Sequence, residues 1–236
     1  LPICRRAAAE TPPRPAPPAD AAAPFAADYG VWLGGLRLGA VALRVALEDG
    51  RYRATAEARS AGAAAWLFSL TAQAEVEGAL AGAIPAPERF RAEGAFGEER
   101  RRMVWRFDPE LEIEAEPPFR RRSYEPGPEE LRGAVDPISA AVAACAPHPA
   151  DAVGDRTLPV FDGRRRIDLR IGSARETGPG RLRAEAQAVP VAGFKAKHLR
   201  RPPIRLSLQW RVEDGSATLE RAWSETTFGA ALLRRI

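Results

Sequence analysis

Side chains that commonly carry out catalysis are scarce in this chain of 236 residues. Its two histidines are His148, in the loop sequence A-P-H-P, and His198, in a basic loop. Neither belongs to an H-x-x-H or H-E-x-x-H pattern, in which one helix face presents two ligands to a zinc ion. A G-x-S-x-G nucleophile elbow and a phosphate-binding loop are also missing. Ser139, His148 and Asp151 have the residue types of a catalytic triad, but their spacing gives no reason to bring them together. The sequence therefore predicts no enzyme, no metal site and no cofactor.

The remaining reactive groups are acidic residues in a strand pattern and two cysteines. Glu112, Glu114 and Glu116 alternate with apolar residues, so we expect them to share a solvated strand face. Cys4 and Cys145 lack the spacing of metal ligands. They could form one disulfide, whereas Cys145 alone fits a small buried apolar residue. Cys4 could also carry a lipid, although Pro-Ile is a poor match to the small residues that normally precede a lipidated cysteine.

The charge balance is weakly basic, with 35 Lys and Arg against 31 Asp and Glu, a net charge of +4. Arginine clusters at 100–102, 120–122 and 164–166 fit solvated strand faces and loops. The competing interpretation is a patch for nucleic acid or anionic lipid. No helix-turn-helix, zinc finger or stacking motif accompanies the clusters, so we expect no nucleic-acid partner. No run of residues approaches the ~20 apolar residues of a membrane-spanning helix.

Tryptophans and large aliphatic residues have the most binding potential. They lie mostly on apolar faces of strand patterns, where they would pack a core or line a cavity inside a curved sheet. Several positions expected to face inward are alanine (Ala54, Ala56, Ala184 and Ala186), too small to fill a wide barrel. This favours a space inside the sheet. The candidate ligand-binding residues are Trp32, Trp66, Trp105, Leu206, Leu208 and Trp210.

An antiparallel β-sheet would position these side chains. Asp-Gly pairs at 49–50, 162–163 and 214–215 lie between β-type residues and predict two-residue hairpin turns. Alternating segments recur about every ten residues, and the clearest runs from Ile204 to Val212. Gly34-Gly35 within the first alternating stretch predicts a bulge or bend. The pattern predicts a mainly β fold, with a strongly curved antiparallel sheet or open β-barrel of roughly ten strands.

Two short helices are expected beside this sheet. Asp136 can cap a helix that has Pro137 at its first position, continues to Cys145 and ends before Pro147. A second helix is expected over 63–70. Residues 1–27 are rich in Ala and Pro, which is typical of a disordered leader or tether after an export signal peptide. Residues 28–236 are expected to form a single β domain.

With these elements in order, five motifs resemble the bacterial family of domains of unknown function numbered 3108 (DUF3108). The motifs are Y-G-V-W-L-G-G-L-R-L-G at 29–39, D-G-R-Y at 49–52, D-P-I-S at 136–139, V-F-D-G-R-R-R-I-D-L at 160–169 and L-Q-W-R-V-E-D-G at 208–215. The resemblance covers about residue 28 to the C-terminus. It implies an exported cell-envelope protein, periplasmic or outer-membrane associated in a Gram-negative bacterium, with a fold similar to the open β-barrels of lipoprotein carriers. The family supplies no catalytic residues, and the Ala-rich interior and Pro-rich leader depart from its pattern.

Two functions remain open from the sequence. The first is non-enzymatic binding of an apolar ligand, a lipid or acyl chain, within the curved sheet. The second is a structural or adaptor module of the envelope, with a solid core and protein partners. A continuous apolar cavity distinguishes the first function from the second.

Overall fold

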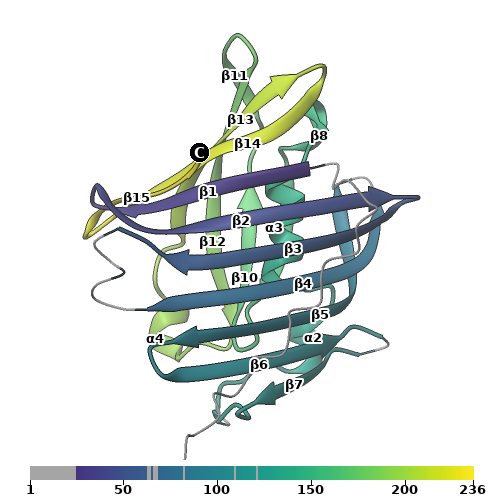
Figure 1. Ribbon diagram of the computed structural model, residues 1–236, viewed down its shortest axis with the longest axis vertical. Helices are drawn as coiled ribbons and strands as arrows, with labels where there is room; N and C mark the ends of the chain where they lie inside the picture. The colour runs from purple at the N-terminus through teal and green to yellow at the C-terminus, as the bar shows by residue number, and fades with distance from the viewer. Residues whose placement is uncertain (1–24, 63–64, 66–68, 82, 109, 121) are drawn as a thin grey trace, which may run out of the picture.

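The architecture is one antiparallel sheet that curls around a helix (Figure 1). The computed structural model describes residues 25–62, 65, 69–81, 83–108, 110–120 and 122–236. The first seven strands of this part are β1 (Phe25–Leu33), β2 (Leu36–Glu48), β3 (Arg51–Ser60), β4 (Leu70–Ala81), β5 (Ile84–Phe96), β6 (Glu99–Arg106) and β7 (Glu112–Glu116). The others are β8 (His148–Pro149), β9 (Arg156–Phe161), β10 (Arg166–Ile171), β11 (Arg175–Gly178), β12 (Arg181–Ala192), β13 (Ile204–Glu213), β14 (Ser216–Thr226) and β15 (Gly229–Arg235).

The helical segments are short and few among the described residues. They are α2 (Pro128–Leu131), α3 (Pro137–Cys145), α4 (Ala196–Leu199) and the 3-10 turn η1 (Ala150–Ala152). The helix expected over 63–70 falls largely outside the described residues, and its last residue, Leu70, begins β4. The domain boundary expected at residue 28 is too late, because β1 already begins at Phe25.

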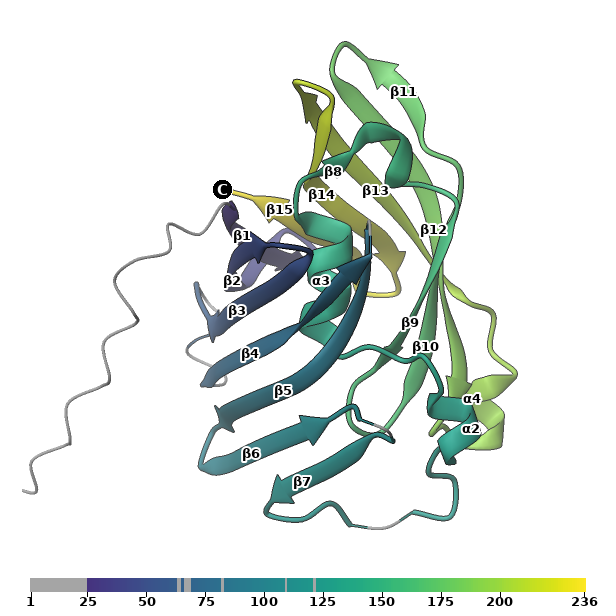
Figure 2. The same cartoon turned by 90° about the vertical axis from the view of Figure 1, so that its right-hand side faces the viewer.

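The strand order is β7-β6-β5-β4-β3-β2-β1-β15-β14-β13-β12-β10-β9, with β11 added to β12 and β8 to β14. The first strand, β1, therefore lies in the middle of the sheet and pairs with the last, β15. Phe161 of β9 contacts Trp105 of β6, with ring centroids 5.4 Å apart. The two ends of the sheet thus approach each other through side chains, and the barrel-like sheet stays open (Figure 2).

The mainly β, antiparallel fold is as predicted, but the estimate of roughly ten strands is wrong, because the described part contains 15. Very short strands such as β8 contribute to the difference, since two residues carry no alternation to detect. Gly34-Gly35 contributes as well. Both glycines have positive φ, +55° and +85°, so they form a tight hairpin turn between β1 and β2 instead of a bulge.

The Asp-Gly turns divide into two kinds. At 49–50 and 214–215 both residues have positive φ and form the expected two-residue turns. The turn at 162–163 was predicted wrongly, because the loop between β9 and β10 has four residues, 162–165. There the Asp162 carboxylate accepts hydrogen bonds from the backbone N–H groups of Arg164 and Arg165, at 2.9 and 2.7 Å. The Asp side chain thus stabilises a wider loop that the dipeptide alone does not distinguish.

The helix α3 begins and ends as predicted. The Asp136 carboxylate accepts hydrogen bonds from the backbone N–H groups of Ile138 and Ser139, at 2.8 and 2.9 Å, and so caps the helix. The helix lies on the concave face and packs against β3, β4, β5, β9 and β14. The indole N–H of Trp210 donates to the Ala144 carbonyl at 3.0 Å. The alanines that suggested an empty interior, such as Ala54 and Ala184, are buried in the same core as α3.

Candidate functional site

The concave face of the sheet changes character along each strand. Tyr52, Val76, Phe90 and Trp105, on four consecutive strands, are buried in the same core as residues of α3. Exposure rises along the same face toward the other end of these strands. On β5 it goes from buried Phe90 through half-buried Ala92 and Gly94 to exposed Phe96. One half of the concave face is therefore filled, and the other half is open.

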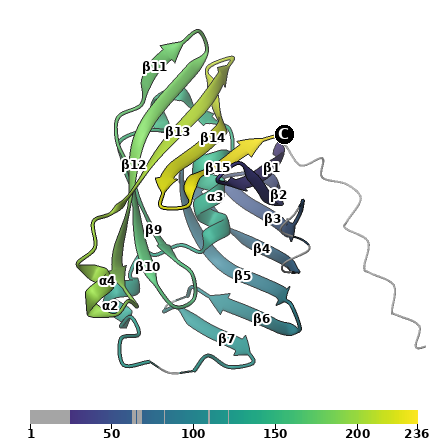
Figure 3. The same cartoon turned by 90° about the vertical axis from the view of Figure 1, so that its left-hand side faces the viewer.

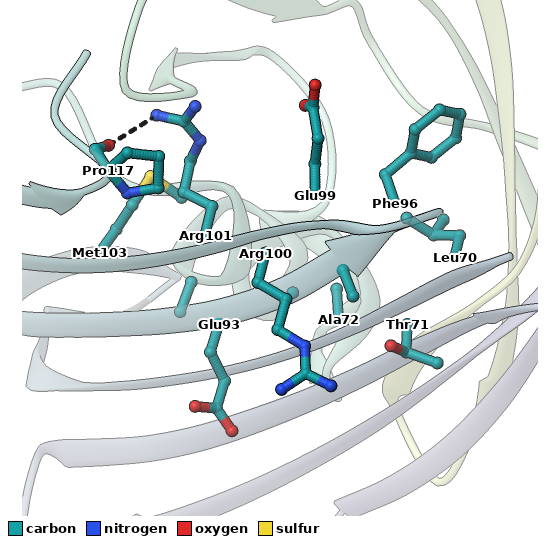
Figure 4. Close-up of a pocket in the computed structure, with 13 residues that line it drawn as sticks. Leu70, Thr71, Ala72, Glu93, Phe96, Glu99, Arg100, Arg101, Met103 and Pro117 are labelled. Atoms are coloured by element: carbon teal, nitrogen blue, oxygen red, sulfur yellow. Dashed lines mark hydrogen bonds between the residues drawn. The ribbon is translucent and has the colours of Figure 1, made fainter.

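The open half contains a hollow of about 510 Å³. Its floor is made of small residues from β4 and β5, mainly Ala72, Ala92 and Gly94, and Met103 of β6 lies beside them. The space is open because the side chains of these floor residues are too small to fill it. The rim consists of longer side chains on the same face: Leu70, Phe96, Glu99, Arg101 and Pro117. Figure 4 shows them on one side of the sheet and Thr71, Glu93 and Arg100 on the other.

One cation, Arg101, is fixed in the wall of the hollow. Its guanidinium donates to the Pro117 carbonyl at 3.0 Å and lies over the Phe119 ring, 4.8 Å from the centroid. Arg164, from the loop after β9, covers the same ring at 4.5 Å. A guanidinium has five N–H donors, so one backbone contact leaves donors for an anionic group. The hollow thus combines an apolar floor with a positioned positive charge.

Three of the residues proposed from the sequence lie in the filled half. Trp105 and Trp210 are 1% and 0% exposed, and Leu208 is 5% exposed. Trp105 packs against Phe90, with ring centroids 4.6 Å apart, as well as against Phe161. Leu206 faces the same side as Leu208 but is only partly buried. These side chains form the packed core beside α3, and none of them lines the hollow.

Of the other two tryptophans proposed from the sequence, only Trp32 is among the described residues. Trp66 falls outside the described residues. Trp32 is on the convex face of β1, where its ring lies directly over Gly30 and Arg37 approaches it at 5.9 Å. A Cβ atom at Gly30 would meet this ring at 2.1 Å, so any larger residue would displace the ring. Trp32 therefore lies on the opposite face of the sheet from Trp105 and Trp210, although the sequence pattern grouped the three residues.

Sequence reasoning did not single out Ala72, Ala92, Gly94 or Met103, the floor of the hollow. The available signal was the alternation of alanine and glycine with charged residues along β5, as in R-A-E-G at 91–94. This signal has the same form as the alanine pattern of β3 and β12. Local alternation identifies the inward face, but it does not show which inward residues a helix will cover.

The buried polar groups belong to the core. Tyr52 Oη and Ser139 Oγ are 2.6 Å apart, and Ser139 in turn donates to Asp136. Burial raises the pKa of Asp136, although its hydrogen bonds with Ser139 and Ile138 act in the opposite direction. His148 is buried and its Nε2 lies 3.1 Å from the Val142 carbonyl. Asp151 is exposed, so Ser139, His148 and Asp151 do not form a triad.

Cys145 is a free, buried thiol of α3, and burial raises its pKa to about 12, which makes it a poor nucleophile. Cys4 lies outside the described residues. Within the described ranges, no group of three His, Cys, Asp or Glu side chains is arranged to hold a metal ion. No helix in those ranges is long and apolar enough to cross a membrane.

Comparison with known proteins places this architecture in a family. The family model described as "Protein of unknown function (DUF3108)" matches residues 25–231. No curated protein matches the sequence. A solved structure described as a beta-barrel-like protein of domain of unknown function DUF1849 from Brucella abortus is similar over 89% of this chain and 94% of that chain, with a TM-score of 0.51 and 10% identity. This likeness concerns the fold alone. The family match covers nearly the whole chain, and the chain therefore belongs to the DUF3108 family.

Proposed function

We propose that this protein binds an elongated apolar ligand, such as the acyl chain of a lipid, in the hollow at the open end of the sheet. We further propose that it acts as a binding protein and catalyses no reaction. The observation that carries the proposal is the division of one concave face into a packed half under α3 and an open half floored by Ala72, Ala92 and Gly94. A volume of about 510 Å³ lies within the range of small-molecule sites.

The arrangement of polar groups supports an amphiphile as the ligand. Arg101 lies in the wall of the hollow, next to the apolar floor. A fixed guanidinium orients a carboxylate or phosphate by charge-assisted hydrogen bonds. An acyl chain along the floor with its anionic end at Arg101 would use both features.

A structural or adaptor role is the second candidate. The observation in its favour is the packed half, where Leu208 and Trp210 belong to one continuous core with α3. A protein that needs only a rigid scaffold would have this core, and the hollow would then hold only water. The two functions therefore make different predictions for substitutions that fill the hollow.

The test uses Ala72→Trp, which places an indole on the floor of the hollow. Its matched control is Ala46→Trp on the convex face of β2, where the original side chain is also half-buried. A fluorescent apolar probe should bind the wild type, should be displaced by palmitate, and should bind Ala46→Trp equally well. Ala72→Trp should lose at least tenfold in probe affinity while its circular dichroism spectrum stays unchanged. Absence of probe binding to the wild type, or equal binding by both variants, would refute the binding function.

We also propose a location in the cell envelope, periplasmic or outer-membrane associated. The support is the Pro- and Ala-rich composition of residues 1–24, which fits a tether between an export signal and the folded sheet. Fractionation of the host cell with an antibody to the protein would test this. Recovery in the cytoplasmic fraction alone would contradict it.

A further inference from the structure

Large apolar side chains from four segments are exposed at the open end of the sheet, where the hollow lies. They come from the start of β2, the β14–β15 turn, the start of β13 and α4. Their exposed fractions are 62% for Leu36, 79% for Phe228, 58% for Ile204 and 42% for Leu199. Exposed apolar residues that cluster mark a binding surface, whereas scattered ones do not.

The four segments all lie at the end of the sheet that faces the viewer in Figure 3. The Gly34 N–H donates to the Ala230 carbonyl at 3.0 Å and so joins the β1–β2 and β14–β15 turns. Ser207 of β13 pairs with Trp223 of β14, so Ile204, three residues earlier, lies toward the end of β14. The connection from β12 through α4 to Ile204 continues the rim. We call the exposed side chains of Leu36, Leu199, Ile204 and Phe228 the apolar rim.

Basic residues surround α4 on the same rim. Lys195, Lys197, Arg200 and Arg201 lie in a segment without an acidic residue between Glu185 and Glu213. In the part of the chain that the structure describes, none of these four side chains makes an ion pair. Elsewhere, arginines pair with glutamates across neighbouring strands, as in Arg53–Glu77 and Arg91–Glu75. We call these four residues the basic rim.

The cations of the basic rim lie close enough together to affect a shared neighbour, His198. Desolvation and then the charges of Arg201, Lys197 and Lys195 lower the pKa of His198. A further guanidinium, that of Arg165, adds to this effect and lies 5.5 Å from the centre of the Phe194 ring. Positive charge is therefore concentrated here without local compensation.

We propose that this end of the molecule docks onto an anionic lipid membrane, with the apolar rim in the interfacial layer and the basic rim on the headgroups. Interfacial binding increases with buried apolar area and with attraction to anionic lipids, and this surface provides both. Nucleic acid is the less suitable partner, because its sites combine cations with aromatic stacking platforms, whereas three of the four apolar rim residues are aliphatic.

Docking in this orientation would turn the open half of the concave face toward the bilayer. The route between a membrane and the hollow would then be short and would avoid water. Membrane docking itself does not require that the hollow binds a ligand, so the two proposals can fail separately.

The charge test uses vesicles of phosphatidylcholine with roughly one quarter phosphatidylglycerol, at low salt. We expect the wild type to sediment with these vesicles, to bind pure phosphatidylcholine far more weakly, and to dissociate as salt rises. A basic residue near such a surface contributes about 1 kcal/mol, which corresponds to roughly fivefold in affinity. Lys197→Gln with Arg201→Gln should therefore weaken binding about 25-fold. The control pair, Arg170→Gln with Arg175→Gln, removes the same charge from exposed positions away from the rim and should leave binding unchanged.

The apolar test compares Phe228→Ser with Ile84→Ser. Ile84 is 64% exposed at the start of β5, at the opposite end of the sheet, so its loss is the matched control. Phe228→Ser should lose at least fivefold in vesicle affinity and Ile84→Ser should lose none. Equal losses in rim and control variants, no binding of the wild type to anionic vesicles, or tighter binding to a short DNA duplex would each overturn the proposal. Displacement of the apolar probe by palmitate, measured without vesicles, should be the same in all these variants and reports separately on the hollow.

Discussion

Leu208 is the residue at which a filled interior and an open interior differ most in their consequences. Its side chain is 5% exposed on the concave face of β13, and the neighbouring inward residue, Trp210, bonds to the backbone of α3. Truncation to alanine would remove atoms that are enclosed on all sides, and the surrounding sheet and helix can collapse only in part. We expect Leu208→Ala to lower the free energy of unfolding by ~3 kcal/mol, within the range for buried leucines.

The matched control is Leu206→Ala, two residues earlier on the same face of β13. Leu206 is only partly buried and lies opposite Ala186, so its truncation should cost ~1 kcal/mol. Urea unfolding followed by tryptophan fluorescence measures both. With a slope of about 2–3 kcal/mol per molar urea, the Leu208→Ala midpoint should fall by about 1 M and the slope should stay constant.

A second substitution, Leu208→Trp, makes the result decisive. A packed core resists the added volume, so the variant should lose ~1–3 kcal/mol. An interior with free space at this position would accept the larger ring without loss. A cost below ~1 kcal/mol for both Leu208→Ala and Leu208→Trp would refute the assignment of Leu208 to the filled half.

Three other predictions concern buried groups outside the hollow. Asp136→Ala should cost ~1–2 kcal/mol in urea unfolding because it removes the cap of α3, whereas Asp136→Asn should cost less, since burial already opposes the charge. Burial lowers the pKa of His148 below 6.5 in the folded state, so stability should be lost as pH falls from about 6.5 toward the folded pKa. His148→Asn should flatten that part of the curve of melting temperature against pH, and an unchanged slope would contradict the assignment. Gly163→Ala should be more destabilising than Gly97→Ala, because both have positive φ but only a Cβ at Gly163 would meet Trp105, at 3.1 Å. Equal melting temperatures would count against this contact.

The features that were predictable from the sequence depend on neighbouring residues. Asp136-Pro137 marks the start of α3, because the cap and the proline act within one helical turn. The turns at 49–50 and 214–215 follow from the ability of Asp-Gly to adopt positive φ. The four-residue loop after Phe161 was not predictable from its Asp-Gly pair. Its length depends on the hydrogen bonds that the Asp162 carboxylate accepts from residues beyond the dipeptide.

The site was less predictable than the fold because burial in this protein is decided by distant segments. Ala54 of β3 and Ala72 of β4 occur in similar alternating patterns, yet α3 covers the first and not the second. For Trp32, the local sequence does not show which face of the strand is buried. Apolar residues occupy both faces of β1, so its pattern does not reveal that Tyr29 faces the core while Trp32 faces outward.

The pairing of β1 with β15 has a consequence for synthesis of the chain. β1 gains its first neighbour, β2, as soon as the hairpin at Gly34-Gly35 forms, but its other edge has no partner until residues 229–235 exist. The meander from β1 to β7 can therefore assemble early. The backbone hydrogen-bonding groups on the other edge of β1 stay unpaired until β15 has been synthesised. Contacts of such high sequence separation slow folding and leave exposed edges open to association with other chains. A chain that ends before Gly229 would keep both β1 and β14 as open edges. The seven-residue strand β15 is therefore needed to join the meander β1–β7 to the strands that pair through β14.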